Sequence, residues 1–279
     1  MRLVDVEHLG HDRVIAAYLV DGCLVDPGPA SSLAGLLRGL GDERPERLLL
    51  THIHLDHAGA AGALVERWPD LEVWVHERGA PHVEDPSKLV ASATRLYGDD
   101  MDRLWGEILP VPRENLRVLT SEEQTIGPWR VAYTPGHASH HVSYLHEPTA
   151  TLFAGDVAGV RIPPEGLVLA PTPPPDIDFT AWHASLDLLE SWKAERVAVT
   201  HFGVWDDVAG QLAECRAALD RMAVRASETT DTGFAEWIRA EIEAAVGADT
   251  TAVYARAMPF DTLHPGLERA LRRVSSTPG

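Results

Sequence analysis

The segment from Thr51 to His57 places four potential metal ligands within six positions, and it constrains the fold more than any other feature of the chain. The apolar run 47–51 that leads into it predicts a buried strand, and the small residues 58–63 after it predict a helix. Histidines two positions apart leave the end of a strand on the same side. The next two ligands then lie in the turn at a helix N-terminus. This short segment can therefore address two metal ions, with the ligands His52, His54, Asp56 and His57.

Three other predicted strands end in further ligands of the same kind. A hydrolytic zinc ion needs about three protein ligands and an open position for water, so one segment does not complete a site. The segments T-P-G-H, L-F-A-G-D and V-A-V-T-H end in His137, Asp156 and His201. Seven ligands exceed what one tetrahedral ion can use. The chain is therefore expected to hold two ions.

Taken together, these segments resemble the metallo-β-lactamase superfamily, and their all-histidine and aspartate set resembles the hydrolase branch that includes glyoxalase II and the lactonases. The resemblance covers about residues 1–205. It implies an α/β fold, the four-layer αβ/βα sandwich, followed here by a C-terminal helical extension. In the secreted β-lactamases a cysteine usually stands at the place of Asp156, so the chain departs from the antibiotic-degrading members. By the resemblance one divalent ion is held by His52, His54 and His137, a second by Asp56, His57 and His201, and Asp156 bridges them.

A site built only from imidazole and carboxylate suits zinc, iron or manganese. Zinc is the first expectation, with iron and manganese as alternatives. Two residues resemble supports of the ligands. His141 ends T-P-G-H-A-S-H-H, where the hydrolase branch often has T-P-G-H-x-x-G-H, so it resembles a residue that orients a ligand; the alternative is a purely structural histidine. His140 stands where that pattern has glycine. Asp26 resembles the first-motif aspartate that braces the ligand loop, or it is a simple turn residue before Pro27.

An aromatic stripe lies between the ligand motifs. Tyr97, Met101 and Trp105 follow one another at a spacing of four, which is typical of one helix face. Such a stripe is more often core than pocket. If it faces the metals instead, it supplies an apolar wall for an acyl chain or ring of a substrate.

Composition indicates a cytoplasmic enzyme that acts on a small molecule. The N-terminus has no long apolar stretch after its first charge, so neither a signal peptide nor a membrane anchor is predicted. The formal charge of −18 disfavours nucleic acid and phospholipid surfaces, and it mildly favours neutral substrates over anionic thioesters. Two cysteines alone exclude a disulfide framework.

Two parts are expected along the chain: a metal-binding catalytic domain over residues 1–205 and a helical extension over 206–279. In the first part, short strands alternate with helices up to residue 201, and a proline-rich loop covers 163–175. In the second, Val208 to Met222 follow a 4-3-4-3 apolar rhythm, a second helix begins near Phe234, and a short third helix starts around Pro265. The extension packs on the sandwich, lines the pocket, or forms a homodimer contact.

The expected function is hydrolysis of an ester, thioester or lactone by a metal-bridging hydroxide, with Asp56 passing the proton to the leaving group. One alternative is a persulfide dioxygenase with a single iron on His52, His137 and Asp156, although those proteins end soon after the last strand. A phosphodiesterase or ribonuclease is a second alternative, which the acidic balance disfavours. A non-catalytic scaffold would have no need for seven intact ligands.

Overall fold

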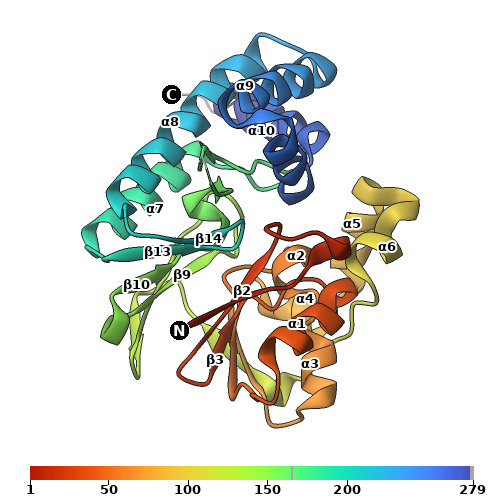
Figure 1. The fold of residues 1–279 in the computed structure, drawn as a ribbon, viewed down its shortest axis with the longest axis vertical. Coiled ribbons are helices and arrows are strands. Elements are labelled where there is room, and N and C mark those ends of the chain that lie inside the picture. The colour runs from red at the N-terminus through yellow and green to blue at the C-terminus, as the bar shows by residue number, and fades with distance from the viewer. Residues whose placement is uncertain (165, 277–279) are drawn as a thin grey trace.

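Two six-stranded β-sheets pack face to face, with helices on their outer sides (Figure 1). The computed structural model describes residues 1–164 and 166–276. This is the expected four-layer arrangement with helices after its last strand. Of the described helices, none is both long and apolar enough to span a bilayer.

The first sheet has the order β1-β2-β3-β4-β5-β6 and runs parallel from β3 to β6. Helices in the connections cover its outer face (Figure 1). The predicted helix after the ligand segment begins earlier than expected: α2 starts at Leu55, so Asp56 and His57 lie in its first turn. The elements are β1 (Arg2–Asp5), β2 (Ala16–Val20), β3 (Cys23–Val25), α1 (Leu33–Leu40), β4 (Arg47–Leu49), α2 (Leu55–Ala58), α3 (Ala61–Arg67), β5 (Glu72–His76), α4 (Ala80–Glu84), α5 (Ser87–Tyr97), α6 (Met101–Trp105) and β6 (Leu116–Leu119).

The second sheet has the order β14-β13-β10-β9-β8-β7 and is antiparallel except between β10 and β13. Between β7 and β10 the strands follow one another through hairpin connections without an α-helix, unlike the alternation of strand and helix in the first sheet. Its elements are β7 (Gln124–Ile126), β8 (Trp129–Tyr133), β9 (Val142–His146), β10 (Thr151–Phe153), α7 (Phe179–Ser191), β13 (Arg196–Val199) and β14 (Gly203–Trp205), with the separate pair β11 (Val160–Arg161) and β12 (Val168–Leu169).

Short 3-10 helices complete the first 205 residues. One of them, η3, joins α5 to α6, so the stripe from Tyr97 to Trp105 keeps nearly continuous helical turns. Asp178 caps α7, because its side chain accepts the backbone N–H of Ala181. The 3-10 helices are η1 (His8–Gly10), η2 (Ala30–Ser32), η3 (Gly98–Asp100), η4 (Arg113–Asn115), η5 (Glu147–Thr149) and η6 (Gly155–Ala158).

The sheets are joined by apolar contacts and by two tyrosines that cross the core. Tyr18 on β2 stands edge-on to Phe153 on β10, with ring centroids 5.5 Å apart. Its hydroxyl donates to the carbonyl of Val199 on β13. In the other direction, Tyr144 on β9 donates to the carbonyl of Leu50 just after β4, at 2.8 Å. Buried hydroxyls that find partners in the opposite sheet fix how the two sheets align.

The extension consists of α8 (Val208–Ser227), α9 (Asp231–Ala257) and α10 (Phe260–Ser276). The 4-3-4-3 stripe of α8 is buried throughout, as its rhythm predicts. The third helix is not short and does not start at Pro265: it starts at Phe260 and contains the proline. Buried Leu263 and Leu267 lie on either side of that proline, so packing outweighs the lost backbone hydrogen bond.

Candidate metal centre

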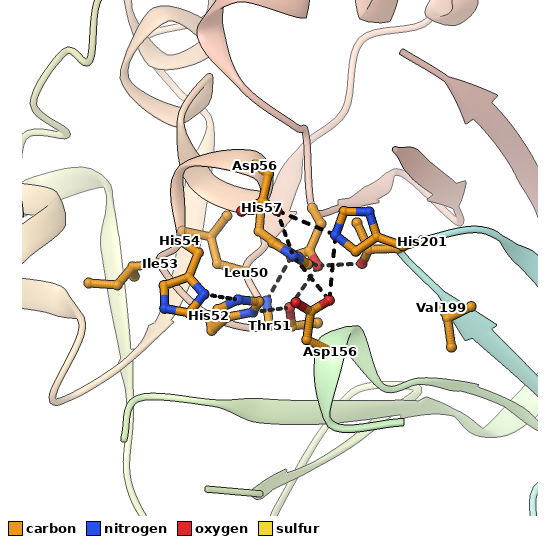
Figure 2. Close-up of polar contacts among 12 residues, drawn as sticks. Leu50, Thr51, His52, Ile53, His54, Asp56, His57, Asp156, Val199 and His201 are labelled. Atoms are coloured by element: carbon orange, nitrogen blue, oxygen red, sulfur yellow. Dashed lines mark hydrogen bonds and ion pairs between the residues drawn. The ribbon is translucent and has the colours of Figure 1, made fainter. Parts of the chain in front are cut away.

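The candidate ligands meet because four strands end at the same place. Strands β8 and β10 both run antiparallel to β9, and β13 runs parallel to β10, so these three strands end at one edge of the second sheet. His137, Asp156 and His201 follow these ends, and the His52–His57 segment follows β4 in the facing sheet. Figure 2 shows the side chains from β4, β10 and β13 converging between the two sheets.

The first cluster consists of His52, His54 and His137. The Nδ1 atom of His54 lies 3.0 Å from Nε2 of His52 and 3.0 Å from Nε2 of His137. His137 donates its Nδ1–H to the carbonyl of Pro171, so its Nε2 carries a free lone pair. Burial, and then the neighbouring imidazoles, lower the pKa of His52 and lower the pKa of His54 to about 4. Neutral rings with converging nitrogens are the form in which histidine binds a metal.

The second cluster consists of Asp56, His57 and His201. Oδ2 of Asp56 lies 3.3 Å from Nε2 of His201 and 3.8 Å from Nε2 of His57. His201 donates its Nδ1–H to the carbonyl of Val14, so its Nε2 faces the cluster. Burial alone would lower the pKa of His57 and His201, but the carboxylates of Asp156 and Asp56 raise both.

Asp156 lies between the two clusters. Its Oδ1 is 3.3 Å from Nε2 of His57, and its Oδ2 is 3.4 Å from Nε2 of His137. Although burial would raise the pKa of this carboxyl, the imidazoles of His57, His201 and His137 hold it well below its usual range. Gly155 allows this placement, because its φ is +48° and a Cβ there would meet Thr51 Oγ1 at 2.5 Å and His141 Nε2 at 2.8 Å.

This donor set fits two divalent ions. Three of its buried polar atoms have no hydrogen-bond partner: Nε2 of His57, Nε2 of His201 and Oδ1 of Asp156. Such orphaned atoms are costly in a folded protein unless another group satisfies them. The two three-residue clusters and the carboxylate between them can offer the lone pairs of these three atoms to bound cations. Histidine nitrogens and carboxylate oxygens suit zinc, iron and manganese alike.

Asp26 supports both clusters through hydrogen bonds. Its carboxylate accepts the Nδ1–H of His57 at 2.8 Å, the backbone N–H and hydroxyl of Thr51, and the hydroxyl of Thr200. Because Thr51 donates its hydroxyl to Asp26, that oxygen is left to accept the Nδ1–H of His52, 3.1 Å away. Asp26 is fully buried and has a φ of +45°, which is uncommon for a residue other than glycine. The contacts are those of a brace rather than of a simple turn residue.

His141 and His140 border the first cluster. His141 is buried, and its Nδ1 lies 3.0 Å from the hydroxyl of Thr134. It contacts His52 by stacking, with ring centroids 5.0 Å apart, and its Nε2 forms no hydrogen bond with any described residue. His140 accepts the backbone N–H of Ile53 at its Nδ1, so a neutral ring carries its proton on Nε2. Its side chain lines the adjoining cavity.

A cavity of about 500 Å³ opens above the clusters and is large enough for a small-molecule substrate. Asp56, Asp156 and His201 lie in its lining. Of the aromatic stripe, Tyr97 and Trp105 also line it, whereas Met101 does not. Trp105 is buried and stacks on His8, so this residue belongs both to the core and to the cavity lining.

Much of the remaining lining was not predicted as part of a site. One side comes from α5, whose apolar residues repeat at helical spacing, a signal visible in the sequence. Another comes from the proline-rich loop and a third from the junction of α9 and α10. No local pattern in the sequence indicates that these distant segments meet. The residues missed are Arg78, His82, Lys88, Leu89, Ala93, Arg95, Leu96, Asp176, Arg256, Met258 and Leu263.

The chain is similar to proteins from several sources. It is 30% identical over 187 residues to the metallo-beta-lactamase fold-containing protein ST1585 of Sulfurisphaera tokodaii, covering 65% of this chain and 68% of that protein. It is also 30% identical over 159 residues to the hydroxyacylglutathione hydrolase of Xanthomonas euvesicatoria pv. vesicatoria, covering 56% of this chain. This chain spans 50% of the length of that relative.

Solved structures show the same fold. The structure of ST1585 from Sulfolobus tokodaii superposes with a TM-score of 0.68 at 23% identity, over 92% of this chain and 93% of that chain. The di-iron-bound form of TTHA1623 superposes with a TM-score of 0.55 at 29% identity, over 72% of this chain and 93% of that chain. The sequence profile of the metallo-beta-lactamase superfamily matches residues 12–201, which include all seven candidate ligands. The chain therefore belongs to the metallo-beta-lactamase superfamily.

Proposed function

We propose that this protein is a dinuclear metal-dependent hydrolase that cleaves an ester, a thioester or a lactone. One observation carries the proposal: two clusters of three ligands, each with two buried members, flank the single carboxylate of Asp156 at the floor of a cavity of substrate size. Bound divalent ions would supply a hydroxide at neutral pH and a Lewis acid for the carbonyl oxygen. The similarity to a hydroxyacylglutathione hydrolase supports the choice of a carbonyl substrate.

The chain itself has three tasks in this reaction. Asp26, Pro171 and Val14 orient His57, His137 and His201 so that each presents Nε2 to the centre. The proline-rich loop and α5 line the cavity and shape the space for the substrate. Hydrolysis adds water across the acyl bond, so one proton must reach the leaving group.

Asp56 is the candidate carrier of that proton. Its carboxyl lines the cavity and is 19% exposed, whereas that of Asp156 is only 5% exposed. Although burial would raise the pKa of Asp56, His57 and His201 hold it below its usual range, so the group is ionised, which is the form that a proton acceptor needs.

The test combines metal analysis with a substrate panel on one sample. We expect about two transition-metal ions per chain and turnover of aryl esters, thioesters or lactones that a chelator removes and added metal restores. The panel also contains a phosphodiester, a chromogenic cephalosporin and a persulfide with an oxygen electrode. A single iron per chain together with oxygen uptake would replace the hydrolase by a dioxygenase, and exclusive turnover of the phosphodiester would replace it by a phosphodiesterase.

A further inference from the structure

Helix α5 has an apolar side that the rest of the described chain covers only in part, with Leu89 half-buried against the core. None of its 11 residues is buried, and its main contacts are with its chain neighbours α4, η3 and α6. Leu89, Ala93, Leu96 and Tyr97 nevertheless line the cavity, and Leu96 is 40% exposed. An apolar helix side that faces a cavity instead of a core is a contact surface for something that enters the cavity.

The opposite wall comes from the C-terminal extension. Ala257, Met258 and Pro259 at the α9–α10 junction line the same cavity, and so does Leu263 in the first turns of α10. Figure 1 shows α5 and α10 on either side of the end of the sandwich where the ligand segment lies. An apolar group placed between them would therefore extend away from the candidate metal centre.

Four cations surround this apolar space. Arg78, Lys88, Arg95 and Arg256 are exposed and line the cavity. None of the four makes an ion pair with a described carboxylate, whereas arginines elsewhere do, as Arg113 does with Glu84. Arg78 lies over the ring of Tyr133, 5.4 Å from its centroid, and Arg256 donates to the carbonyl of Ala252, so both keep their full charge.

The acidic groups of the lining do not neutralise these cations. Asp56 and Asp156 belong to the candidate metal centre, and Asp176 accepts hydrogen bonds from the backbone N–H and hydroxyl of Ser139. The chain as a whole carries a formal charge of −18. A positive cavity mouth on such a protein raises the local concentration of an anion that the whole molecule would repel.

We propose that the substrate is an anionic amphiphile. Its carbonyl group lies at the metal centre, its apolar chain or ring lies between α5 and the α9–α10 junction, and an anionic group remote from the carbonyl meets the cations of the mouth. The proposal rests on the proposed hydrolase function. It reverses the preference for neutral substrates expected from net charge, because the local field at the mouth and not the total charge acts on the bound substrate.

The test uses three esters that differ in one feature at a time. 4-Nitrophenyl acetate has no chain, 4-nitrophenyl octanoate adds an apolar chain, and mono-4-nitrophenyl suberate has the same chain length with a terminal carboxylate. We expect kcat/KM to rise in that order. Two exposed ion pairs of about 0.2–1 kcal/mol each predict that the suberate ester exceeds the octanoate ester by about two- to thirtyfold.

The double variant Lys88→Gln/Arg95→Gln should reduce the ratio of suberate to octanoate kcat/KM towards one. The control is Lys193→Gln/Arg269→Gln, which removes the same charge from exposed positions outside the cavity and should keep the ratio. Equal kcat/KM for the two long esters, or an equal loss of the ratio in both double variants, would overturn the proposal while the hydrolase function stands.

A binding measurement separates this failure from failure of the proposed function. Titration calorimetry compares suberic acid monoamide with octanamide on the protein as purified. If no ester is turned over but the monoamide still binds more tightly, and Lys88→Gln/Arg95→Gln alone removes the difference, the cavity takes an anionic amphiphile and the hydrolase proposal fails. If the two amides bind equally, the anionic amphiphile is wrong.

Discussion

The floor and the walls of the cavity are built in opposite ways. The ligand floor, meaning the seven candidate ligands, follows strand ends inside the sandwich, and fixed hydrogen bonds such as that from His57 to Asp26 hold the rings. The helical walls, meaning α5 and the α9–α10 junction, present side chains from helices far apart in the sequence. Chemistry that needs fixed geometry therefore lies on rigid elements, and selectivity lies on elements that can vary without disturbing it.

This contrast makes a general prediction. Changes in the floor should affect every substrate and the bound metal, whereas changes in the walls should affect only substrates with a long or charged group. The individual predictions test that division, beginning with a change in which wall and core coincide.

Deletion of residues 206–279 should prevent folding. The extension forms part of one wall, but α8 also buries Val208, Leu212, Cys215, Leu219 and Met222. Full burial of such a side chain contributes about 1.5–3 kcal/mol, so five of them approach a whole stability margin of about 5–15 kcal/mol. We expect a protein ending at Trp205 to be insoluble or aggregated by light scattering, with the full chain prepared in parallel. A soluble, monomeric and fully active product would show that the extension is neither core nor wall.

Asp156→Ala should abolish turnover of every substrate. The change removes the carboxylate between the two clusters and leaves Nε2 of His57 and His137 without their acidic neighbour. Loss of several kcal/mol of metal-dependent stabilisation lowers kcat by about a thousandfold or more, and metal per chain should fall in elemental analysis. Asp42→Ala, at an exposed position outside the ligand set and the cavity lining, is the control. Normal kcat with reduced metal content would remove Asp156 from the chemistry.

The floor was far easier to predict than the walls. His52 to His57, His137, Asp156 and His201 each follow an apolar run with a local signature, and a strand end fixes where such a residue points. The stripe of Tyr97, Met101 and Trp105 was ambiguous, because periodicity identifies a helix face without saying what covers it. In the structure the stripe divides: Trp105 is both core and lining, Tyr97 is lining, and Met101 is outside the lining.

The unpredicted part depends on contacts between distant segments. Arg256 and Met258 reach the cavity only because α8 packs on the sandwich and turns the chain back towards α5. The predicted start of α10 was wrong for a similar reason. Pro265 favours a helix start in the local sequence, but it is tolerated inside the helix because the flanking leucines are buried. Net charge has the same limit, because composition does not say where charges lie.

Substitutions at the supports of the floor should weaken metal binding without removing it. Asp26→Asn replaces one of the two carboxylate oxygens that accept from His57, Thr51 and Thr200 with an NH₂ donor, and His141→Ala loses the ring stacked on His52. Losses of this kind typically cost about 10- to 100-fold in metal affinity. Competition with a chromogenic chelator measures it, and kcat at saturating metal should recover most of its value. If His141→Ala keeps its metal but is as inactive as Asp156→Ala, His141 takes part in the reaction directly.

Leu96→Gln should change selectivity alone. Leu96 is 40% exposed and lines the cavity, so the substitution removes apolar contact area without opening the core. Partial burial of a leucine is worth about 1 kcal/mol, which predicts a fall of about fivefold in kcat/KM for 4-nitrophenyl octanoate. Val224→Gln on α8, where the side chain is 59% exposed and outside the cavity, is the matched control. A similar fall for 4-nitrophenyl acetate would mean that α5 supports the floor and that floor and walls are not independent.

The smallest effect concerns a buried strand-end histidine that is not a candidate ligand. His76 ends β5, stacks on Tyr133 with ring centroids 4.4 Å apart, and accepts the backbone N–H of Arg78 at its Nδ1. Burial lowers the pKa of His76 from its ordinary value to about 4. In the unfolded chain the group titrates near 6.5, so between pH 6.5 and 4 the unfolded state binds more protons, and His76 makes the protein less stable as pH falls.

His76→Gln cannot bind that proton, so it should flatten the loss of stability with acid. One proton taken up only by the unfolded chain lowers the free energy of unfolding by at most about 1.4 kcal/mol per pH unit. Screening by nearby solvent reduces this slope to about 1 kcal/mol or less. Thermal unfolding midpoints at pH 7 and pH 5, compared with His11→Gln at an exposed position, measure the difference. Equal slopes for both variants and the wild type would mean that acid sensitivity comes from the ligand floor alone. A flatter slope for His76→Gln would show that burial at a strand end is sufficient to produce it, with or without a metal.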